Sequence, residues 1–205
     1  MRVGIAVTLL SATVMTALGV AGSSSASRGG VTQGAAGSVS PSVAVTLPEA
    51  PAPAPRTWGS ATIASGGASL FYPAGWRPIP GDRGTVSVAL RDRMGLYRGY
   101  LNVTPRQGAE SLAGWASFRT ARNTADGDRR LREVTAAENL RFTNAHGSCV
   151  VDDYLSRIGS HPYRELACIV AGKRYTSVFI GAALLSDWPE LGPVALRAAE
   201  ALVVR

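Results

Sequence analysis

Apolar and polar residues alternate along much of the chain, and strict alternation predicts β-strands. From Val86 to Leu90 the large apolar side chains occupy every second position, and residues 97–104 mirror this pattern beyond Met94 and Gly95. We expect these two stretches to pair as a hairpin. Shorter strands are expected at residues 68–72, 131–134 and 139–143.

A second hairpin is expected where residues 149–151 and 167–170 flank a polar turn that contains Gly159 and Pro162. If the numbers of paired residues sum to 317, Cys149 lies opposite Cys168. Directly opposed Cβ atoms are about 4.5–5.5 Å apart, which small adjustments bring to disulfide geometry. The register therefore predicts a disulfide between Cys149 and Cys168.

The same register predicts the other neighbours across this hairpin. It sets Tyr154 opposite Tyr163 and Asp153 opposite Arg164. It also opposes Asp152 to Glu165, and like charges across a ladder are destabilising. We expect either a neighbouring arginine to neutralise this acidic pair or a bulge to shift it, with Arg157 or Arg164 as the preferred partner.

Residues 174–185 are almost continuously apolar, which predicts a central strand covered on both faces. Two helices are expected to cover it. One is predicted at residues 111–123, with Glu110 near its positive end, and the other begins after Gly192 at Pro193. Residues 187–190 are expected to form a separate capped turn. The fold class is α+β: a mostly antiparallel sheet sandwiched by an internal helix and a C-terminal helix.

The first residues of the chain predict export. After Arg2 the stretch from residue 3 to residue 21 carries no charge, and small residues follow to Ala26. This is the pattern of a signal peptide, residues 1–26, cleaved after Ala26. The alternative is a retained anchor, although glycine, serine and threonine dilute the apolar run, and its length is at the lower limit for a spanning helix.

Residues 27–57 are rich in Ala, Pro, Gly and Ser, and they end in an Ala-Pro alternation. Such a segment has too few large apolar groups to offset its conformational entropy, so we expect a disordered linker that acts as a spacer. Residues 58–205 are then the folded domain. Its two cysteines, in an exported chain, favour a disulfide.

The chain is cationic, with a formal net charge of +7, and Lys173 is its only lysine. Arginine with abundant Ala and Gly is typical of high-GC actinobacterial proteins. A cationic chain raises the possibility of nucleic-acid binding, but export argues against it. Anionic wall polymers or lipid headgroups are the expected counterions, and the alternative is a solvated surface without a partner. Membrane contact is expected only if the N-terminal segment is retained.

Several of these segments resemble one known fold family. They are FYPAGW at residues 71–76, ESLAGW at residues 110–115, the long apolar strand and the terminal helix that ends in ALVVR. Together they resemble the PsbP/Mog-like α/β/α sandwich, and in particular the actinobacterial exported LpqN-type proteins. The resemblance implies a non-enzymatic envelope protein that binds partner proteins or lipid-like ligands. The N-terminal region has no cysteine to carry a lipid, so the anchoring of the lipoprotein members does not transfer.

Catalytic and metal-binding patterns are weak in this sequence. His146 and His161 are the only histidines, and no Gly-x-Ser-x-Gly elbow surrounds a serine. Neither the histidines with Asp152, Asp153 and Glu165 nor the fragment at residues 126–128 matches a recognised metal site. We therefore predict no catalytic, metal-binding or cofactor-binding residues.

Aromatic and arginine residues give the better indication of a binding surface. Most of the large aromatic residues are expected in the core, and Trp76 and Trp115 are the candidates to line a groove between sheet and helix that holds an acyl chain or an apolar peptide. Arg91, Arg93 and Arg98, near the tip of the first hairpin, suit an anionic headgroup, and the alternative is a solvated tip without a ligand. The sequence thus predicts an exported binding module for an envelope protein or a lipid-like ligand. A small secreted hydrolase or cell-wall enzyme and a secreted protease-inhibitor-like domain are the alternatives.

Overall fold

Two antiparallel sheets and two helices make up the computed structural model of this protein, which describes residues 45–205. The elements are β1 (Gly59–Thr62), β2 (Ala68–Tyr72), β3 (Arg77–Pro78), β4 (Val86–Arg91), β5 (Tyr97–Pro105), α1 (Trp115–Ala125), β6 (Arg129–Phe142), β7 (Ala145–Leu155), β8 (Pro162–Ala171), β9 (Thr176–Leu184), α2 (Trp188–Glu200) and β10 (Val203–Val204).

The larger sheet has seven strands in the order β3-β4-β5-β9-β8-β7-β6, and every neighbouring pair is antiparallel. The apolar run predicted to be central forms β9 in the middle of this order, buried from Ser177 to Ala183. The β4–β5 hairpin is also confirmed. The β7–β8 hairpin has the predicted register, with Cys149 opposite Cys168, and their Cα atoms are 4.1 Å apart in a disulfide.

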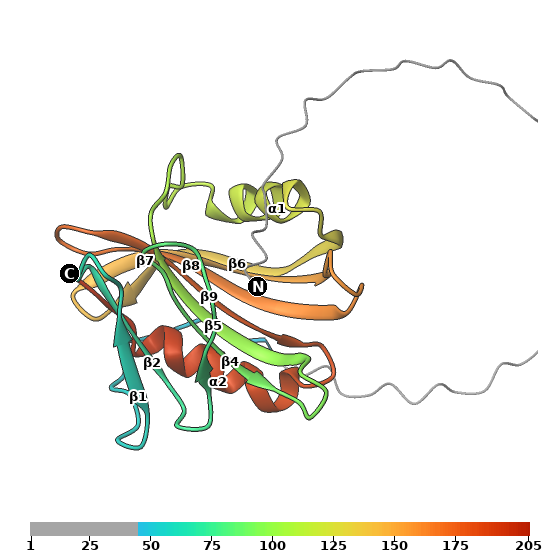
Figure 1. Cartoon of the computed structure of the whole chain (residues 1–205). Helices are drawn as coiled ribbons and strands as arrows, with labels where there is room; N and C mark the ends of the chain where they lie inside the picture. Colours follow the sequence, from blue (N-terminus) through green and yellow to red (C-terminus); the bar gives the residue numbers. More distant parts are fainter. Residues whose placement is uncertain (1–44) are drawn as a thin grey trace, which may run out of the picture. The chain divides into compact units, whose positions relative to one another are not determined.

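A helix covers each face of this sheet, as Figure 1 shows. The amphipathic helix α2 packs on one face, beside a small sheet in the order β1-β2-β10. Leu70, Leu101, Phe179 and Leu202 are fully buried in the core between these layers. The other face lies under α1, where Trp115, Val150 and Ile169 form a separate core. The predicted α+β sandwich is confirmed.

The helix boundaries differ from the predicted ones. Gly114 has φ +71°, a left-handed conformation, so α1 begins at Trp115 rather than at Ser111, and the Glu110 carboxylate instead accepts the Gln107 N–H. The predicted separate turn and second helix form one helix, α2, with Pro193 in its interior. Buried Trp188 extends the apolar stripe by a turn, and this outweighs the one backbone hydrogen bond that Pro193 removes.

The two short strands expected at residues 131–134 and 139–143 form a single long strand, β6, together with the residues between them. Its pairing with β7 shifts register at three points, between Arg129 and Arg132, Glu133 and Thr135, and Ala137 and Leu140. Each shift interrupts the alternation of inward and outward side chains. A continuous strand therefore resembles two in the sequence.

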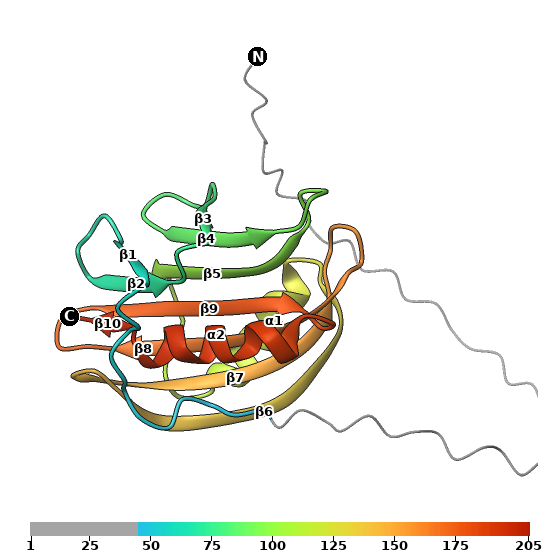
Figure 2. The ribbon, with the colours of Figure 1, turned by 90° about the horizontal axis from the view of Figure 1, so that it is seen from below.

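Residues 45–57, the end of the expected linker, lie against the domain. Val45 and Leu47 are half-buried on the core, and Ala52 N–H donates to the Glu200 carbonyl at 3.1 Å. The Arg197 guanidinium donates to the Pro53 carbonyl at 2.7 Å. A free spacer would make no such contacts. Two apolar side chains two positions apart, together with these hydrogen bonds, hold the segment on the domain although its average hydropathy is low. Figure 2 shows its course beside β6.

The predicted signal peptide, residues 1–26, and the first part of the linker lie outside the described residues. Within residues 45–205, neither helix is both long and apolar enough to cross a membrane.

Candidate functional site

The main candidate site is a groove of about 600 Å³ between α1 and the sheet. It exists because α1 lies over β6, β7 and β8, while the floor on its open side comes from β5 and β9. The floor consists of Tyr97, Tyr100, Asn102, Thr104, Val178 and Ile180. The helix supplies the wall, with Trp115, Phe118, Arg119 and Arg122.

The alternation along β5 gives the floor its character. Leu101 and Val103 point into the core under α2, so Tyr100, Asn102 and Thr104 face the groove. The Asn102 amide donates to the Ser87 hydroxyl at 2.7 Å, which fixes the orientation of this side chain. The groove floor therefore offers amide, hydroxyl and aromatic groups beside the aliphatic residues of β9.

Helix α1 is held on the sheet by residues four positions apart, which lie on one helix face. The indole N–H of buried Trp115 donates to the Ala167 carbonyl at 2.9 Å. One turn later, Arg119 binds both oxygens of Glu165, at 2.6 and 2.9 Å. Burial opposes the charge of Arg119, but the charge and hydrogen bonds of Glu165 outweigh it and hold the Arg119 pKa above its usual value. Asn123, the next residue of this stripe, is also buried.

Three acids lie opposite one another beneath α1: Glu133 on β6, Asp152 on β7 and Glu165 on β8. Asp152 is only 1% exposed, and neither of its carboxylate oxygens has a hydrogen-bond partner within residues 45–205. Burial, followed by the negative charges of Glu165 and Glu133, raises the pKa of Asp152 to about 7. Arg119 thus neutralises Glu165, and the raised pKa of Asp152 favours its protonated, neutral form.

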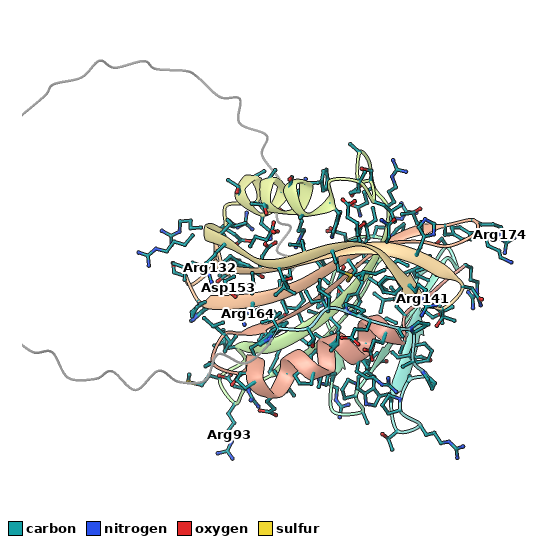
Figure 3. The ribbon with its side chains drawn as sticks, turned by 180° about the vertical axis from the view of Figure 1, so that it is seen from behind. Arg93, Arg132, Arg141, Asp153, Arg164 and Arg174 are labelled. Atoms are coloured by element: carbon teal, nitrogen blue, oxygen red, sulfur yellow. A yellow bond between two sulfur atoms is a disulfide. The ribbon has the colours of Figure 1, made fainter. Side chains whose placement is uncertain are left out.

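The predicted opposition of Asp152 and Glu165 is confirmed, but the expected arginine partners are wrong. Arg164 lies on the other face and binds Asp153 at 2.6 and 3.0 Å, together with Arg132 (Figure 3). Burial would raise the pKa of Asp153, and these two arginines hold it below its usual value. Arg157 contributes only its backbone N–H, to Asp128.

A second cavity of about 500 Å³ adjoins the groove, and the two share Tyr97, Tyr100 and Asp126. The hydroxyls of Tyr100 and Tyr154 lie 3.3 Å apart at this junction. Burial raises the pKa of both phenols, which are therefore neutral hydrogen-bonding groups. The remaining lining includes Tyr163, Ile158 and His161.

The predicted binding residues are spread over different surfaces. Trp115 forms part of the groove wall, but Trp76 is buried in the core under α2. Arg91 donates to the Tyr97 hydroxyl, and Arg93 is exposed. Arg98 lies at a register shift of β5 and binds Asp187 at 3.0 Å and Glu190 at 2.8 Å, so it is not a free headgroup ligand.

The two histidines lie at opposite ends of the β7–β8 hairpin. His146 pairs with Ala171 at the start of β7, and His161 precedes β8. Within the described residues, neither imidazole is hydrogen-bonded to a serine, aspartate or glutamate. No group of three or more potential ligands with metal-binding geometry occurs in residues 45–205.

Sequence reasoning missed most of the groove floor. Tyr100, Asn102 and Thr104 were visible as the polar alternate positions of a predicted strand. A strand with one apolar face and one face of hydroxyl, amide and aromatic groups indicates a surface that is only partly covered. The ion pair between Arg119 and Glu165 has no local pattern in the sequence that predicts it, because the residues are 46 positions apart.

A comparison with solved structures finds this architecture elsewhere. The solution structure of cyanobacterial PsbP (CyanoP) from Synechocystis sp. PCC 6803 matches with a TM-score of 0.51 and 16% identity, over 73% of this chain and 93% of that chain. The fold is similar to that of PsbP. At this identity the likeness concerns the fold alone, and at that level it confirms the predicted PsbP-like resemblance.

The crystal structure of LpqN, involved in cell envelope biogenesis of Mycobacterium tuberculosis, also matches, with a TM-score of 0.41 and 12% identity. The match covers 72% of this chain and 90% of LpqN. No family model and no curated protein sequence matches this chain.

Proposed function

We propose that this protein is exported and acts at the cell envelope as a binding module, holding a lipid-like ligand in the groove between α1 and β5. The N-terminal sequence pattern supports export, and so does the disulfide, since disulfides persist in oxidising compartments. The groove itself carries the proposal of binding. Its volume lies within the range of about 300–1,000 Å³ of small-molecule sites.

The lining suits an amphiphile better than a purely apolar molecule. Val178, Ile180 and Phe118 offer apolar contact, while Asn102 and Thr104 offer hydrogen bonds to a polar group. The Arg119 guanidinium at the wall is already neutralised by Glu165, so the groove does not require an anionic ligand. A neutral or zwitterionic amphiphile is the expected ligand class.

A zwitterionic fluorescent amphiphile, lysophosphatidylcholine with an NBD-labelled acyl chain, tests this proposal. We expect saturable binding with one probe per protein, and at least about tenfold weaker binding by Thr104→Trp, whose ring fills the groove. Ser60→Trp adds the same ring to the exposed surface of β1 and serves as the control. Equal probe affinity in both variants would overturn the assignment of the groove.

A peptide segment of a partner protein is the second candidate occupant. The groove and the adjoining cavity share three lining residues, so an extended segment could contact both of these neighbouring cavities. Crosslinking from envelope extracts through a photoreactive residue at position 104, followed by mass spectrometry, separates the candidates. A crosslinked peptide would assign the groove to a partner protein and contradict the lipid-like ligand. A crosslinked lipid would support the lipid-like ligand.

A further inference from the structure

Two large aliphatic side chains project into solvent at one end of the seven-stranded sheet. Met94, in the turn between β4 and β5, is 90% exposed, and Ile158, in the turn between β7 and β8, is 77% exposed. Strand pairing sets the start of β5, the end of β9 and the start of β8 in adjacent rows, so the two turns lie at the same end (Figure 2). Leu185, 38% exposed, follows β9 at this end. We call this end of the domain the tip surface.

Arginines surround the two turns. Five of them have no carboxylate within ion-pair distance in the described part of the chain, namely Arg91, Arg93, Arg129, Arg130 and Arg157. The four acidic residues in the loops at this end of the sheet each accept a hydrogen bond or form an ion pair. Asp92 accepts the N–H groups of Met94 and Leu96, Asp128 accepts that of Arg157, Asp126 binds Arg122, and Asp187 binds Arg98. The tip surface therefore presents five arginines without an ion-pair partner among residues 45–205, beside carboxylates that are each engaged in a hydrogen bond or an ion pair.

The opposite end of the sheet provides a comparison within the same molecule. Arg141 and Arg174 lie there, at the far side from Arg93 and Arg132 in Figure 3. Lys173 is exposed beside Arg174. Of the large apolar residues exposed in residues 45–205, this end has only Tyr175, at 38%. Both ends are cationic, but exposed aliphatic side chains occur only at the tip surface.

We propose that the tip surface docks on an anionic phospholipid bilayer, with Met94 and Ile158 entering the interface and the surrounding arginines contacting lipid phosphates. Apolar side chains surrounded by cationic side chains are favoured where the headgroups of a bilayer meet its acyl chains. The two turns belong to hairpins separated by β9, so their centres are about three strand spacings, roughly 14 Å, apart. Two protruding turns at that separation suit a deformable planar surface. Ile158 and Arg157 also line the cavity that adjoins the groove, whereas Met94 and Arg93 line neither, so Met94 and Arg93 report docking independently of a groove ligand.

Environment-sensitive labels at the tips test the docking in the full chain. Met94→Cys and Ile158→Cys, each labelled with the fluorophore NBD, report whether that side chain leaves water. Labels on the added cysteine are selective because Cys149 and Cys168 are buried in their disulfide. Lys173→Cys, at the opposite end, is the matched control. The labels report local insertion even if the apolar run at residues 3–21 binds vesicles by itself.

With vesicles of phosphatidylcholine and phosphatidylglycerol, we expect a several-fold rise and blue shift of NBD emission at positions 94 and 158, and no change at position 173. Vesicles of phosphatidylcholine alone should give little response. Removing charge with Arg93→Gln and Arg157→Gln should weaken binding about fivefold each, equivalent to about 1 kcal/mol per arginine. The pair Arg141→Gln and Arg174→Gln should leave tip insertion unchanged.

Three results would overturn the proposal: unchanged NBD emission at positions 94 and 158 on vesicles that bind the protein, an equal response at position 173, or no effect of the Arg93 and Arg157 substitutions. The first would mean that the chain binds through another segment. An acidic protein that elicits the tip response when vesicles do not would assign the surface to a protein partner instead.

Discussion

At the scale of single residues, Asp152 is the least satisfied group in the described structure. It is buried beneath α1 between two strands that also carry acids, and the only arginine above it binds Glu165. A carboxylate in this position would be an uncompensated buried charge, so the fold retains the proton. Because ionisation would place this charge beneath α1, we expect the stability of the fold to fall as the pH rises.

Asp152→Asn should remove this pH dependence. The native pKa of Asp152 is raised to about 7, whereas the unfolded carboxyl titrates near 3.8. The native state therefore retains a proton that the unfolded state releases, and the stabilisation present below about pH 4 is lost as the pH rises to 7. At pH 8 the variant should have a higher free energy of unfolding than the natural chain, by about 2–4 kcal/mol. Urea denaturation at pH 5 and pH 8 measures the difference.

Asp153→Asn is the matched control, since its carboxylate is bound by Arg164 and Arg132 and has a lowered pKa. It should lose stability at both pH values. If Asp152→Asn and the natural chain lose stability equally between pH 5 and pH 8, Asp152 is ionised in the native state.

Residue pairs on adjacent strands were predictable, and pairs between layers were not. The opposition of Cys149 to Cys168 and of Asp153 to Arg164 follows from one register, which the polar turn fixes. The contact of Arg119 with Glu165 depends on where α1 crosses the sheet. No periodicity along the chain encodes that crossing.

At the scale of elements, the Cys149–Cys168 disulfide joins two strands that the β7–β8 ladder already holds together. Reduction should therefore lower the free energy of unfolding by less than about 3 kcal/mol, because the loop it closes is short. Urea denaturation of the oxidised and reduced protein provides the comparison. Thiol titration of the unfolded, unreduced protein should find no reactive thiol, and two reactive thiols would show that the bridge is absent in solution.

Gly181 sets the distance between β9 and α2. A Cβ atom at this position would lie 2.7 Å from the Ala195 Cβ and 3.2 Å from Leu101 and Phe179. Gly181→Ala should push α2 away from the sheet and lower the free energy of unfolding by about 1–3 kcal/mol, the usual cost of overpacking. Gly75→Ala, where a Cβ meets nothing within 4 Å, is the control. Equal stability of the two variants in urea denaturation would mean that α2 moves without cost.

Elements with strong periodicity were predicted from the sequence, while those fixed by tertiary contacts were not. The central strand β9 and the two hairpins follow from apolar patterns alone. The two-residue strands β3 and β10 have no pattern of their own, and they form by pairing with β4 and β2. Helix α2 extends past Pro193 because buried Trp188 holds its first turn on the sheet.

At the scale of the whole molecule, residues 45–57 decide where the domain begins. Val45 and Leu47 are half-buried, while Thr46 and Glu49 are exposed. These contacts extend the domain from Trp58 back to Val45, so the spacer predicted for residues 27–57 ends before Val45.

The substitutions Val45→Ser and Leu47→Ser together should therefore lower the free energy of unfolding by about 1–3 kcal/mol, because half-buried aliphatic side chains contribute less than the roughly 1.5–3 kcal/mol each of full burial. Thr46→Ala and Glu49→Ala, which change exposed neighbours in the same segment, should have little effect. Urea denaturation measures both pairs, and limited proteolysis should cleave the first pair faster within residues 45–57. If both pairs of substitutions give equal stability and equal cleavage, residues 45–57 belong to the spacer and the domain begins at Trp58.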